Sequence, residues 1–338
     1  MLTRNRPMQW LLAALLACGF APLVQAEAPQ LPTENKSCPM KLLASLDVRG
    51  SERGQLLVPV SIAGHDVWMS LRLGEGILSL YSAAVADWHL KTIRMEIGGR
   101  RIEINGKPIT DMVRENFSLG KQPFQNWPMI LIPADAVPLI GSYEGKPIVG
   151  ELATRFLMAV DAELNLAQNK INLFEHVKCG TDAVYWGGTI TAVHLEFDQT
   201  GLLHFPMELE DQEIQTSFDT SQNSSRISTE VTKKFFGFDE NSPGLQSEAL
   251  PNGAQSHSYR AMSLTAKGVE IRNATIELWP TTSCYPDRSV SRLDGIGCTQ
   301  VFGAMPFAIG TDLMRKLRIY IASKEGRIYF TRAEPPAP

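Results

Sequence analysis

The chain has 338 residues, of which 44% are hydrophobic and 20% are charged, and its formal net charge is -4. This length allows one large domain or two ordinary ones, and the apolar content is normal for a chain with a sizeable core. The weakly negative charge excludes the basic footprint that a nucleic-acid-binding protein carries, so we expect no nucleic-acid partner.

The first 26 residues are predicted to be a signal peptide. Arg4 and Arg6 give a positive start, residues 10–20 form an apolar run, and Val24-Gln25-Ala26 supplies a small-residue cleavage pattern. The apolar run is too short for a comfortable membrane span, so we expect none in the mature chain. The sequence therefore predicts a periplasmic or secreted protein.

The rest of the chain contains an internal repeat. Residues 58–62 (VPVSI) and 205–209 (FPMEL) both alternate like strands with a proline near the start, and they lie 147 residues apart. The same offset aligns residues 70–74 (SLRLG) with residues 217–221 (SFDTS) without a gap. The two halves of the chain are therefore predicted to share one fold.

The repeat continues through the later parts of both halves. Each half next has the start of a short helix, then strand segments, then two apolar residues with a glycine, and finally a predicted β-hairpin. The matching segments are 80–86 with 227–233, 117–119 with 262–264, 130–133 with 277–280, 148–150 with 308–310, and the hairpins 164–174 with 319–330.

Short strands separated by turn signals, with one or two short helices in each half, are typical of a small β-barrel or sandwich-like lobe. We predict a mostly β protein with two tandem lobes. The predicted division is a signal peptide (1–26), an N-terminal extension (27–51), a first lobe (52–180), an inter-lobe connection (181–192), a second lobe (193–332) and a tail (333–338).

The second half contains a segment that resembles the active site of aspartic proteases. In that family a strand ends in Asp-Thr-Gly, Asp-Thr-Ser or Asp-Ser-Gly, followed by a turn and a short helix. Here Phe218-Asp219-Thr220-Ser221 is followed by Ile227-Ser228 and by a helical start at residues 231–238. The resemblance implies that Asp219 is a catalytic-type aspartate, with Thr220 and Ser221 as its motif neighbours.

Other parts of the chain extend this resemblance to bacterial retropepsin-like and pepsin-like proteins. The family has a later apolar-apolar-glycine motif that buttresses the active-site loop, and Ile309-Gly310 and Val149-Gly150 resemble it. The end of the first lobe, residues 156–179, is also similar to bacterial retropepsin-like proteins. The resemblance spans residues 52–332 and implies two acid-protease-like β-barrel lobes.

The first half departs from the family at the catalytic position. Aspartic proteases use two carboxylates, one from each lobe, which share a proton. The positions that match Asp219-Thr220-Ser221 are Arg72-Leu73-Gly74. An arginine stays protonated, so Arg72 facing Asp219 would hold that carboxylate ionised through charge-assisted hydrogen bonds. The other interpretation of Arg72 is an ordinary strand arginine that faces solvent.

The loss at Leu73 matters as well, because the family's threonine hydroxyl at that position braces the loop of the other lobe. Glu75 is the nearest spare carboxylate, but its place three residues along the turn makes it a poor substitute. We therefore expect an impaired or non-catalytic homologue that binds peptide or protein in an inter-lobe cleft. One alternative is an active endopeptidase in which two second lobes pair their Asp219 residues in a homodimer. Another is a structural envelope protein.

Four cysteines lie beyond the predicted signal peptide, and export permits disulfides. Four cysteines allow three pairings, and sequence alone does not choose between them. We favour Cys38 with Cys179, which bracket the first lobe, and Cys284 with Cys298 as a local clamp. The remaining cysteine, Cys18, lies in a loose match to a lipoprotein cleavage box, so anchoring there stays an alternative. No spacing suggests a metal site, and no cofactor is expected.

Two segments are predicted to flank the site. Residues 94–107 alternate like a hairpin around Gly98-Gly99, where the family carries its substrate-covering flap. The comparable stretch of the second lobe, residues 239–258, is polar and rich in Gly, Pro and Ser. We expect a mobile loop there.

Overall fold

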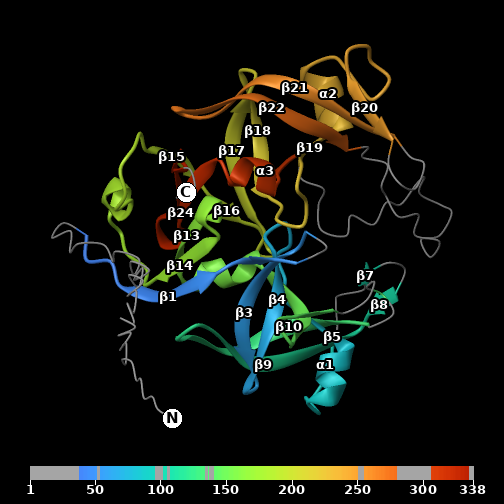
Figure 1. Ribbon diagram of the computed structural model, residues 1–338, viewed down its shortest axis with the longest axis vertical. Helices are drawn as coiled ribbons and strands as arrows, with labels where there is room; N and C mark the ends of the chain where they lie inside the picture. Colours follow the sequence, from blue (N-terminus) through green and yellow to red (C-terminus); the bar gives the residue numbers. More distant parts are fainter. Residues whose placement is uncertain are drawn as a thin grey trace, which may run out of the picture. The chain divides into compact units, whose positions relative to one another are not determined.

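Strands dominate the computed structural model of the chain (Figure 1). The structure describes residues 38–51, 54–95, 102–104, 107–133, 136, 141–249, 255–279 and 306–334. The predicted signal peptide, Cys18, Cys284 and Cys298 lie outside these residues.

The first lobe is a closed barrel of six strands. Its strand order is β3-β4-β12-β5-β10-β9, and β9 pairs back onto β3. Two of these steps are parallel, β4 with β12 and β5 with β10, and the others are antiparallel. The strands are β3 (Leu56–Ile62), β4 (His65–Arg72), β5 (Ser79–Tyr81), β9 (Asp111–Leu119), β10 (Gln122–Ile132) and β12 (Lys146–Ala153).

The second lobe repeats this barrel strand for strand. Its order is β17-β18-β23-β19-β22-β21, closed by β21 on β17, and the parallel steps fall at the same two places. The strands are β17 (Leu203–Leu209), β18 (Gln212–Phe218), β19 (Ser225–Ser228), β21 (Gln255–Ala266), β22 (Val269–Trp279) and β23 (Phe307–Ile309).

The pairing register matches the predicted repeat offset. Val58 lies opposite Met69 in the first lobe, and Phe205 lies opposite Thr216 in the second, which are the same positions moved by 147 residues. The prediction of a mostly β chain with two tandem barrel lobes is confirmed. Alternation along these strands places one face in each barrel interior, as the burial of every second residue of β17 shows.

A third sheet joins the lobes. Its order is β1-β14-β13-β24-β25-β15, and its central pair, β13 with β24, takes one strand from each lobe. The two hairpins that were predicted from the sequence supply its four inner strands. The members are β1 (Leu42–Asp47), β13 (Asp161–Asn165), β14 (Lys170–Phe174), β15 (Thr191–His194), β24 (Leu317–Ala322) and β25 (Arg327–Arg332).

Both hairpins of this sheet turn in the same way. A short 3-10 helix, η2 (Leu166–Gln168) or η4 (Ser323–Glu325), leads to one residue with positive φ. That residue is Asn169 at φ 52° in the first hairpin and Gly326 at φ 65° in the second, and these two residue types adopt the left-handed region most readily.

The helices are short and lie at matching places in the two lobes. α1 (Ser82–Asp87) follows β5, and α2 (Thr229–Phe235) follows β19, where the Ser228 hydroxyl accepts a hydrogen bond from the Glu230 amide. η1 (Thr154–Ala159) follows β12, and α3 (Thr311–Met314) follows β23. η3 (Gly180–Ala183) lies in the connection between the lobes. In the described part of the chain, no helix is long and apolar enough to cross a membrane.

The two segments expected to flank the site differ from their predictions. Strands β7 (Ile102–Ile104) and β8 (Lys107–Ile109) pair with each other as a separate two-stranded antiparallel sheet, whereas residues 98 and 99 lie outside the described residues. Residues 239–258 include a strand, β20 (Gln246–Ala249), paired with β21. An edge strand needs only backbone partners, so its exposed polar side chains gave no strand signal. The other short strands are β2 (Arg49–Gly50), β6 (Ile93–Arg94), β11 (Ser142–Tyr143) and β16 (Glu196–Phe197).

One of the two predicted disulfides, Cys38–Cys179, is present and spans 141 residues of sequence. It ties the segment before β1 to the start of the connection between the lobes. The second predicted pair lies outside the described residues. A disulfide that closes so long a loop restricts the unfolded chain most strongly.

Replacing Cys38 and Cys179 together by serine is therefore expected to lower the free energy of unfolding by about 2–5 kcal/mol. Urea unfolding of the mature protein measures this loss, and a reducing agent should lower the wild-type midpoint towards that of the variant. Equal midpoints for the oxidised wild type and the double variant would contradict a stabilising role for this bond.

Candidate functional site

The loops that follow β4 and β18 meet at the boundary between the lobes. The Leu73 amide donates a hydrogen bond to Oγ1 of Thr220 at 2.9 Å, and that hydroxyl donates to the Leu71 carbonyl at 2.6 Å. Thr220 is 1% exposed and Leu73 is fully buried. One threonine therefore braces both loops, whereas Leu73 has no hydroxyl with which to return the contact.

Asp219 lies against Gly74 of the first lobe. A Cβ atom on Gly74 would stand 2.9 Å from Oδ1 of Asp219, so a side chain at that position would displace the Asp219 carboxylate. The same Oδ1 accepts hydrogen bonds from the amide and the hydroxyl of Ser221, at 2.9 and 2.6 Å. The Asp219 amide donates to the Ile309 carbonyl at 2.8 Å. These hydrogen bonds hold the Asp219 carboxylate in place. Because the residue is partly exposed, the carboxylate is still accessible to a ligand.

Arg72 turns to its own lobe. Its Nη2 lies 3.3 Å from Oε1 of Glu75, and its Nε lies 3.5 Å from Oε1 of Glu151. Among the described residues these two glutamates are its ion-pair partners, and none of its ion pairs reaches Asp219. Its side chain is 27% exposed, so it is not an ordinary solvent-facing arginine either.

The charges around Arg72 keep it protonated. Burial opposes its ionisation, but the charges of Glu151, Glu75 and Asp219 outweigh that effect and raise the pKa of Arg72. Among these carboxylates, Asp219 has the smallest effect on the pKa of Arg72, after Glu151 and Glu75. The expected ion pair between Arg72 and Asp219 is absent, and Arg72 pairs with Glu151 instead. The sequence repeat did not identify Glu151 as part of this site.

The position of Glu151 follows from strand register. Leu152 pairs with Leu71 in the first lobe, and Ile309 pairs with Phe218 in the second. Because Leu71 and Phe218 are equivalent by the repeat offset, the residues that precede Leu152 and Ile309 are equivalent too. Those residues are Glu151 and Ala308.

The same register shows that Gly150, which the sequence repeat aligned with Gly310, is not its first-lobe counterpart. That counterpart is Ala153, three residues after Gly150, and matching backbone bonds agree: Thr154 donates to the Glu75 carbonyl, and Thr311 donates to the Gln222 carbonyl. Both glycines are still places of close approach. A Cβ on Gly310 would lie 2.5 Å from the Ser224 backbone, and one on Gly150 would lie 2.1 Å from the Ser79 carbonyl oxygen.

Glu75 and Glu151 form a coupled pair of carboxyl groups. Burial, the charge of Glu151, the charge of Asp219 and a hydrogen bond with Glu151 together raise the pKa of Glu75 to about 7, against the opposing effect of Arg72. Glu151 is buried and accepts a hydrogen bond from the Ser79 hydroxyl at 3.3 Å. The proton that Glu75 keeps up to pH about 7 limits the negative charge of this cluster below that pH.

The sequence carried one signal for this cluster. Glu151 is the only charged residue in the otherwise apolar run Ile148–Ala153, and a charge in a buried strand requires a partner. That requirement points to a nearby arginine, and β4 is the neighbouring strand. In the described residues, no group of His, Cys, Asp and Glu could hold a metal ion.

Comparisons with known proteins give fold likenesses only. No family model matches the chain, and neither does any curated protein. Similar solved structures include basic 7S globulin from soybean (TM-score 0.46, 10% identity, 87% of this chain and 95% of that one). Conglutin gamma, a basic 7S globulin from lupine seeds, gives a TM-score of 0.48 at 11% identity, over 87% of this chain and 96% of that one. A retropepsin-like aspartic protease from Rickettsia conorii gives 0.28 at 14% identity, over 44% of this chain and 95% of that one.

The strand order of this chain describes its fold independently of these likenesses. Two equivalent six-strand barrels share a central sheet and present the ends of β4 and β18 to each other. This arrangement is the mostly β, two-barrel fold that the resemblance to aspartic proteases implies. It brings Gly74 next to Asp219 and Leu73 next to Thr220, whereas Arg72 pairs with Glu75 and Glu151.

The raised pKa of Glu75 predicts a pH dependence of stability. The folded state holds this proton up to pH about 7, whereas an unfolded glutamate loses it near its ordinary pKa of about 4.3. The stability that the proton confers is therefore complete below pH about 4 and is lost as pH rises through 7. Because 35% of the side chain is exposed, the loss should be no more than about 1–2 kcal/mol.

Urea unfolding at pH 4.5, 6 and 7.5 tests this expectation with Glu75→Gln as the reference. The free energy of unfolding of the wild type should fall relative to that of the variant over this range, because glutamine cannot ionise. A difference that stays constant with pH would contradict the assigned protonation of Glu75.

Proposed function

We propose that the chain is an exported aspartic-protease-like protein that does not use dyad catalysis and binds an extended peptide or protein segment where its lobes meet. One observation carries the non-catalytic part: Arg72 is neutralised by Glu75 and Glu151 within its own lobe. The first lobe therefore offers Asp219 neither a second free carboxylate nor a cation committed to it.

Dyad catalysis requires two carboxyl groups that share one proton between the lobes, so that one activates a water while the other donates a proton. Here the carboxyl group with the raised pKa is Glu75, which lies 3.3 Å from the Arg72 guanidinium, and its neighbour Glu151 belongs to the same lobe. Asp219 has Ser221 as its hydrogen-bond partner. This arrangement supports an anchoring role for Asp219.

The binding part rests on what the fold retains. Asp219 is partly exposed, and its loop is braced against the first lobe through Thr220. The β7–β8 hairpin forms a sheet of its own, apart from the barrel strands, and we propose that it covers the bound segment. A held carboxylate beside a covering hairpin suits an extended chain, whose backbone amides supply donors.

The export part rests on the Cys38–Cys179 disulfide, which favours an oxidising compartment. Together with the predicted signal peptide, it supports a periplasmic or secreted location. Lipoprotein anchoring at Cys18 is the alternative route to the same compartment.

The competing function is an active endopeptidase in which two second lobes pair their Asp219 residues. That pairing would need the second lobe to leave the first, which means breaking both Thr220 hydrogen bonds and the β13–β24 pairing. These contacts weigh against it.

A cleavage assay tests the non-catalytic part. Purified mature protein is incubated with casein between pH 3 and 7, and we expect no cleavage by the wild type or by Asp219→Asn. In the rebuilt variant, Arg72→Asp supplies the second carboxylate and Leu73→Thr supplies the second bracing hydroxyl. Glu151→Ala removes the glutamate that would otherwise lose its Arg72 partner. The rebuilt variant should gain slow, acid-optimum cleavage that disappears when Asp219→Asn is added. Wild-type cleavage that Asp219→Asn abolishes would overturn the proposal.

A peptide-display selection followed by titration tests the binding part. Peptides selected on the wild type should bind Asp219→Asn at least tenfold more weakly, and they should bind Asp66→Asn, an exposed first-lobe control, as tightly as the wild type. Equal affinity for all three proteins would place binding elsewhere.

A further inference from the structure

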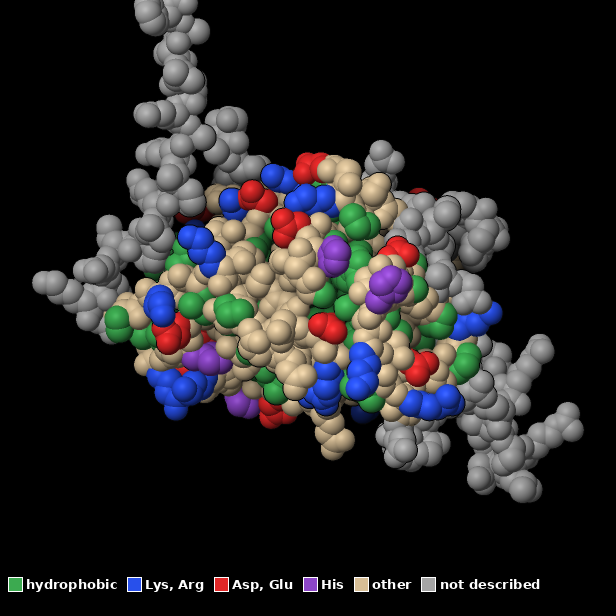
Figure 2. Space-filling view, turned by 90° about the horizontal axis from the view of Figure 1, so that it is seen from below, with side chains coloured by type: hydrophobic (Ala, Val, Ile, Leu, Met, Phe, Trp, Pro, Cys, Tyr) green, Lys and Arg blue, Asp and Glu red, His purple; other side chains and the backbone are tan. Residues whose placement is uncertain are grey.

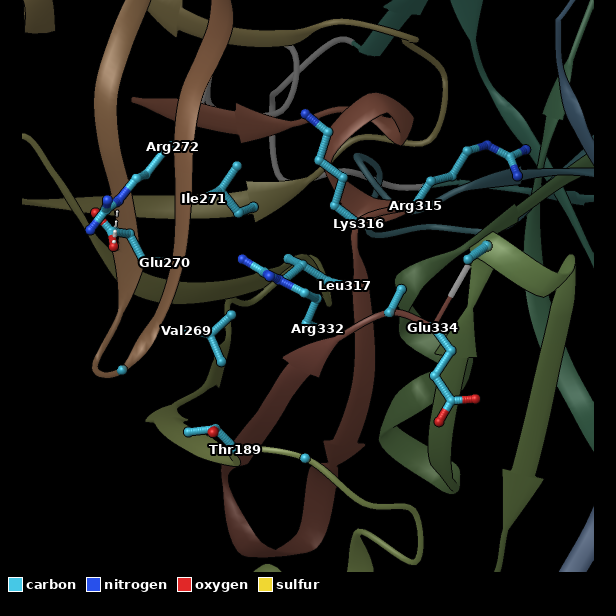
Figure 3. Close-up of a pocket in the computed structure, with 14 residues that line it drawn as sticks. Thr189, Val269, Glu270, Ile271, Arg272, Arg315, Lys316, Leu317, Arg332 and Glu334 are labelled. Atoms are coloured by element: carbon cyan, nitrogen blue, oxygen red, sulfur yellow. Dashed lines mark ion pairs between the residues drawn. The ribbon is translucent and has the colours of Figure 1, made fainter. Parts of the chain in front are cut away.

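A hollow in the surface lies away from the Asp219 loops. Its volume is about 950 Å³, and it is bounded by the turn between β21 and β22, the end of α3 and the end of β25 (Figure 3). It shares no residue with Asp219, its neighbours or the Arg72 cluster. We call it the basic groove and define it by Val269, Ile271, Lys316, Leu317 and Arg332, with Arg272 and Arg315 at its ends.

Strand register brings two cations to one rim of the groove. Leu317 at the start of β24 lies opposite Arg332 at the end of β25. The Ala333 amide donates a hydrogen bond to the Lys316 carbonyl at 2.9 Å. This bond holds the end of β25 against the residue that precedes β24. Lys316 and Arg332 are both exposed, and the backbone fixes them as neighbours.

The charges in the groove do not cancel. Arg272 is paired with Glu270 at 2.9 Å, and Arg315 donates to the Leu166 carbonyl and to Asn169. In the described part of the chain, Lys316 and Arg332 have no carboxylate within ion-pair distance. Four cations and two acids line the groove, so it carries a net charge of about +2 in a chain whose formal charge is -4.

The floor of the groove is apolar. Val269, Ile271 and Leu317 line it, and Figure 3 shows the Arg332 side chain reaching from β25 towards the two β22 residues. By contrast, the face shown in Figure 2 intersperses basic and acidic side chains without a large patch of one sign. A net positive rim over an apolar floor is therefore a local feature, and it suits a ligand that has both carboxylates and apolar side chains.

We propose that the basic groove binds an extended acidic segment of a partner protein, with its carboxylates at Lys316 and Arg332 and its apolar side chains on the floor. Charge complementarity selects the acidic partner. The volume favours a segment over a small inorganic anion, because it lies within the range of about 300–1,000 Å³ that accommodates ligands of many atoms.

Fluorescence anisotropy with the mature full chain tests the groove. The probes are two labelled peptides of equal length, one alternating Glu and Leu and the other alternating Lys and Leu. The acidic peptide should bind at least tenfold more tightly than the basic one at 50 mM salt, and raising the salt to 300 mM should weaken it severalfold. The reversal Lys316→Glu with Arg332→Glu should weaken acidic-peptide binding at least tenfold. The matched reversal Lys91→Glu with Lys121→Glu, at exposed first-lobe positions, should leave it unchanged.

Equal binding of the two peptides, or an unchanged affinity after the groove reversal, would overturn the proposal. Full displacement of the acidic peptide by inorganic phosphate at constant ionic strength would mark a small-anion site and would overturn it as well. Concentration-dependent dimerisation that the reversal abolishes would identify a second copy as the occupant and would also contradict it. Circular dichroism checks that each variant is folded. If the reversal variant does not fold, Lys316→Gln with Arg332→Gln replaces it, and this variant should also weaken acidic-peptide binding.

Discussion

The requirement to neutralise Arg72 determines the rest of the candidate site. A guanidinium does not lose its proton, and a partly buried one that lacks a carboxylate partner would be costly. Glu151 meets that need from the adjacent parallel strand, at the position where the second lobe has Ala308. The raised pKa of Glu75 lets that residue keep its proton up to pH about 7, so the excess negative charge is reduced below that pH. The presence of Arg72 and the presence of Glu151 in the first lobe are therefore physically linked.

The asymmetry at Leu73 is tolerated because other contacts hold the lobes together. Thr220 makes both hydrogen bonds on its own, to the Leu71 carbonyl and to the Leu73 amide. The β13–β24 pairing and one continuous cluster of buried residues that draws on both barrels carry the remaining association. A lost hydroxyl therefore leaves the fold intact. Without a hydroxyl at Leu73, the first-lobe loop does not return the brace that Thr220 provides. In aspartic proteases these braces hold two carboxylates facing each other, and here only Asp219 supplies a carboxylate at that position.

The sequence predicted the barrels well because a constant offset of 147 residues preserves both strand register and side-chain alternation through β4 and β18. It failed where that offset changes. Before β23 the second lobe is longer, so aligning Gly150 with Gly310 hid the true equivalence of Ala153 with Gly310, and with it the place of Glu151. The polar edge strand β20 was missed because backbone pairing alone supports it. The joining of both hairpins into one sheet is a long-range pairing that no local pattern specifies.

The most direct test of the central claim is a pair of double-mutant cycles on the free energy of unfolding at pH 7. One cycle combines Arg72→Met with Glu151→Gln, and the other combines Arg72→Met with Asp219→Asn. The account predicts a coupling energy of about 2 kcal/mol or more for Arg72 with Glu151, and less than about 0.5 kcal/mol for Arg72 with Asp219. A larger coupling for the pair with Asp219 would show that Arg72 serves the opposite lobe, and it would contradict the account.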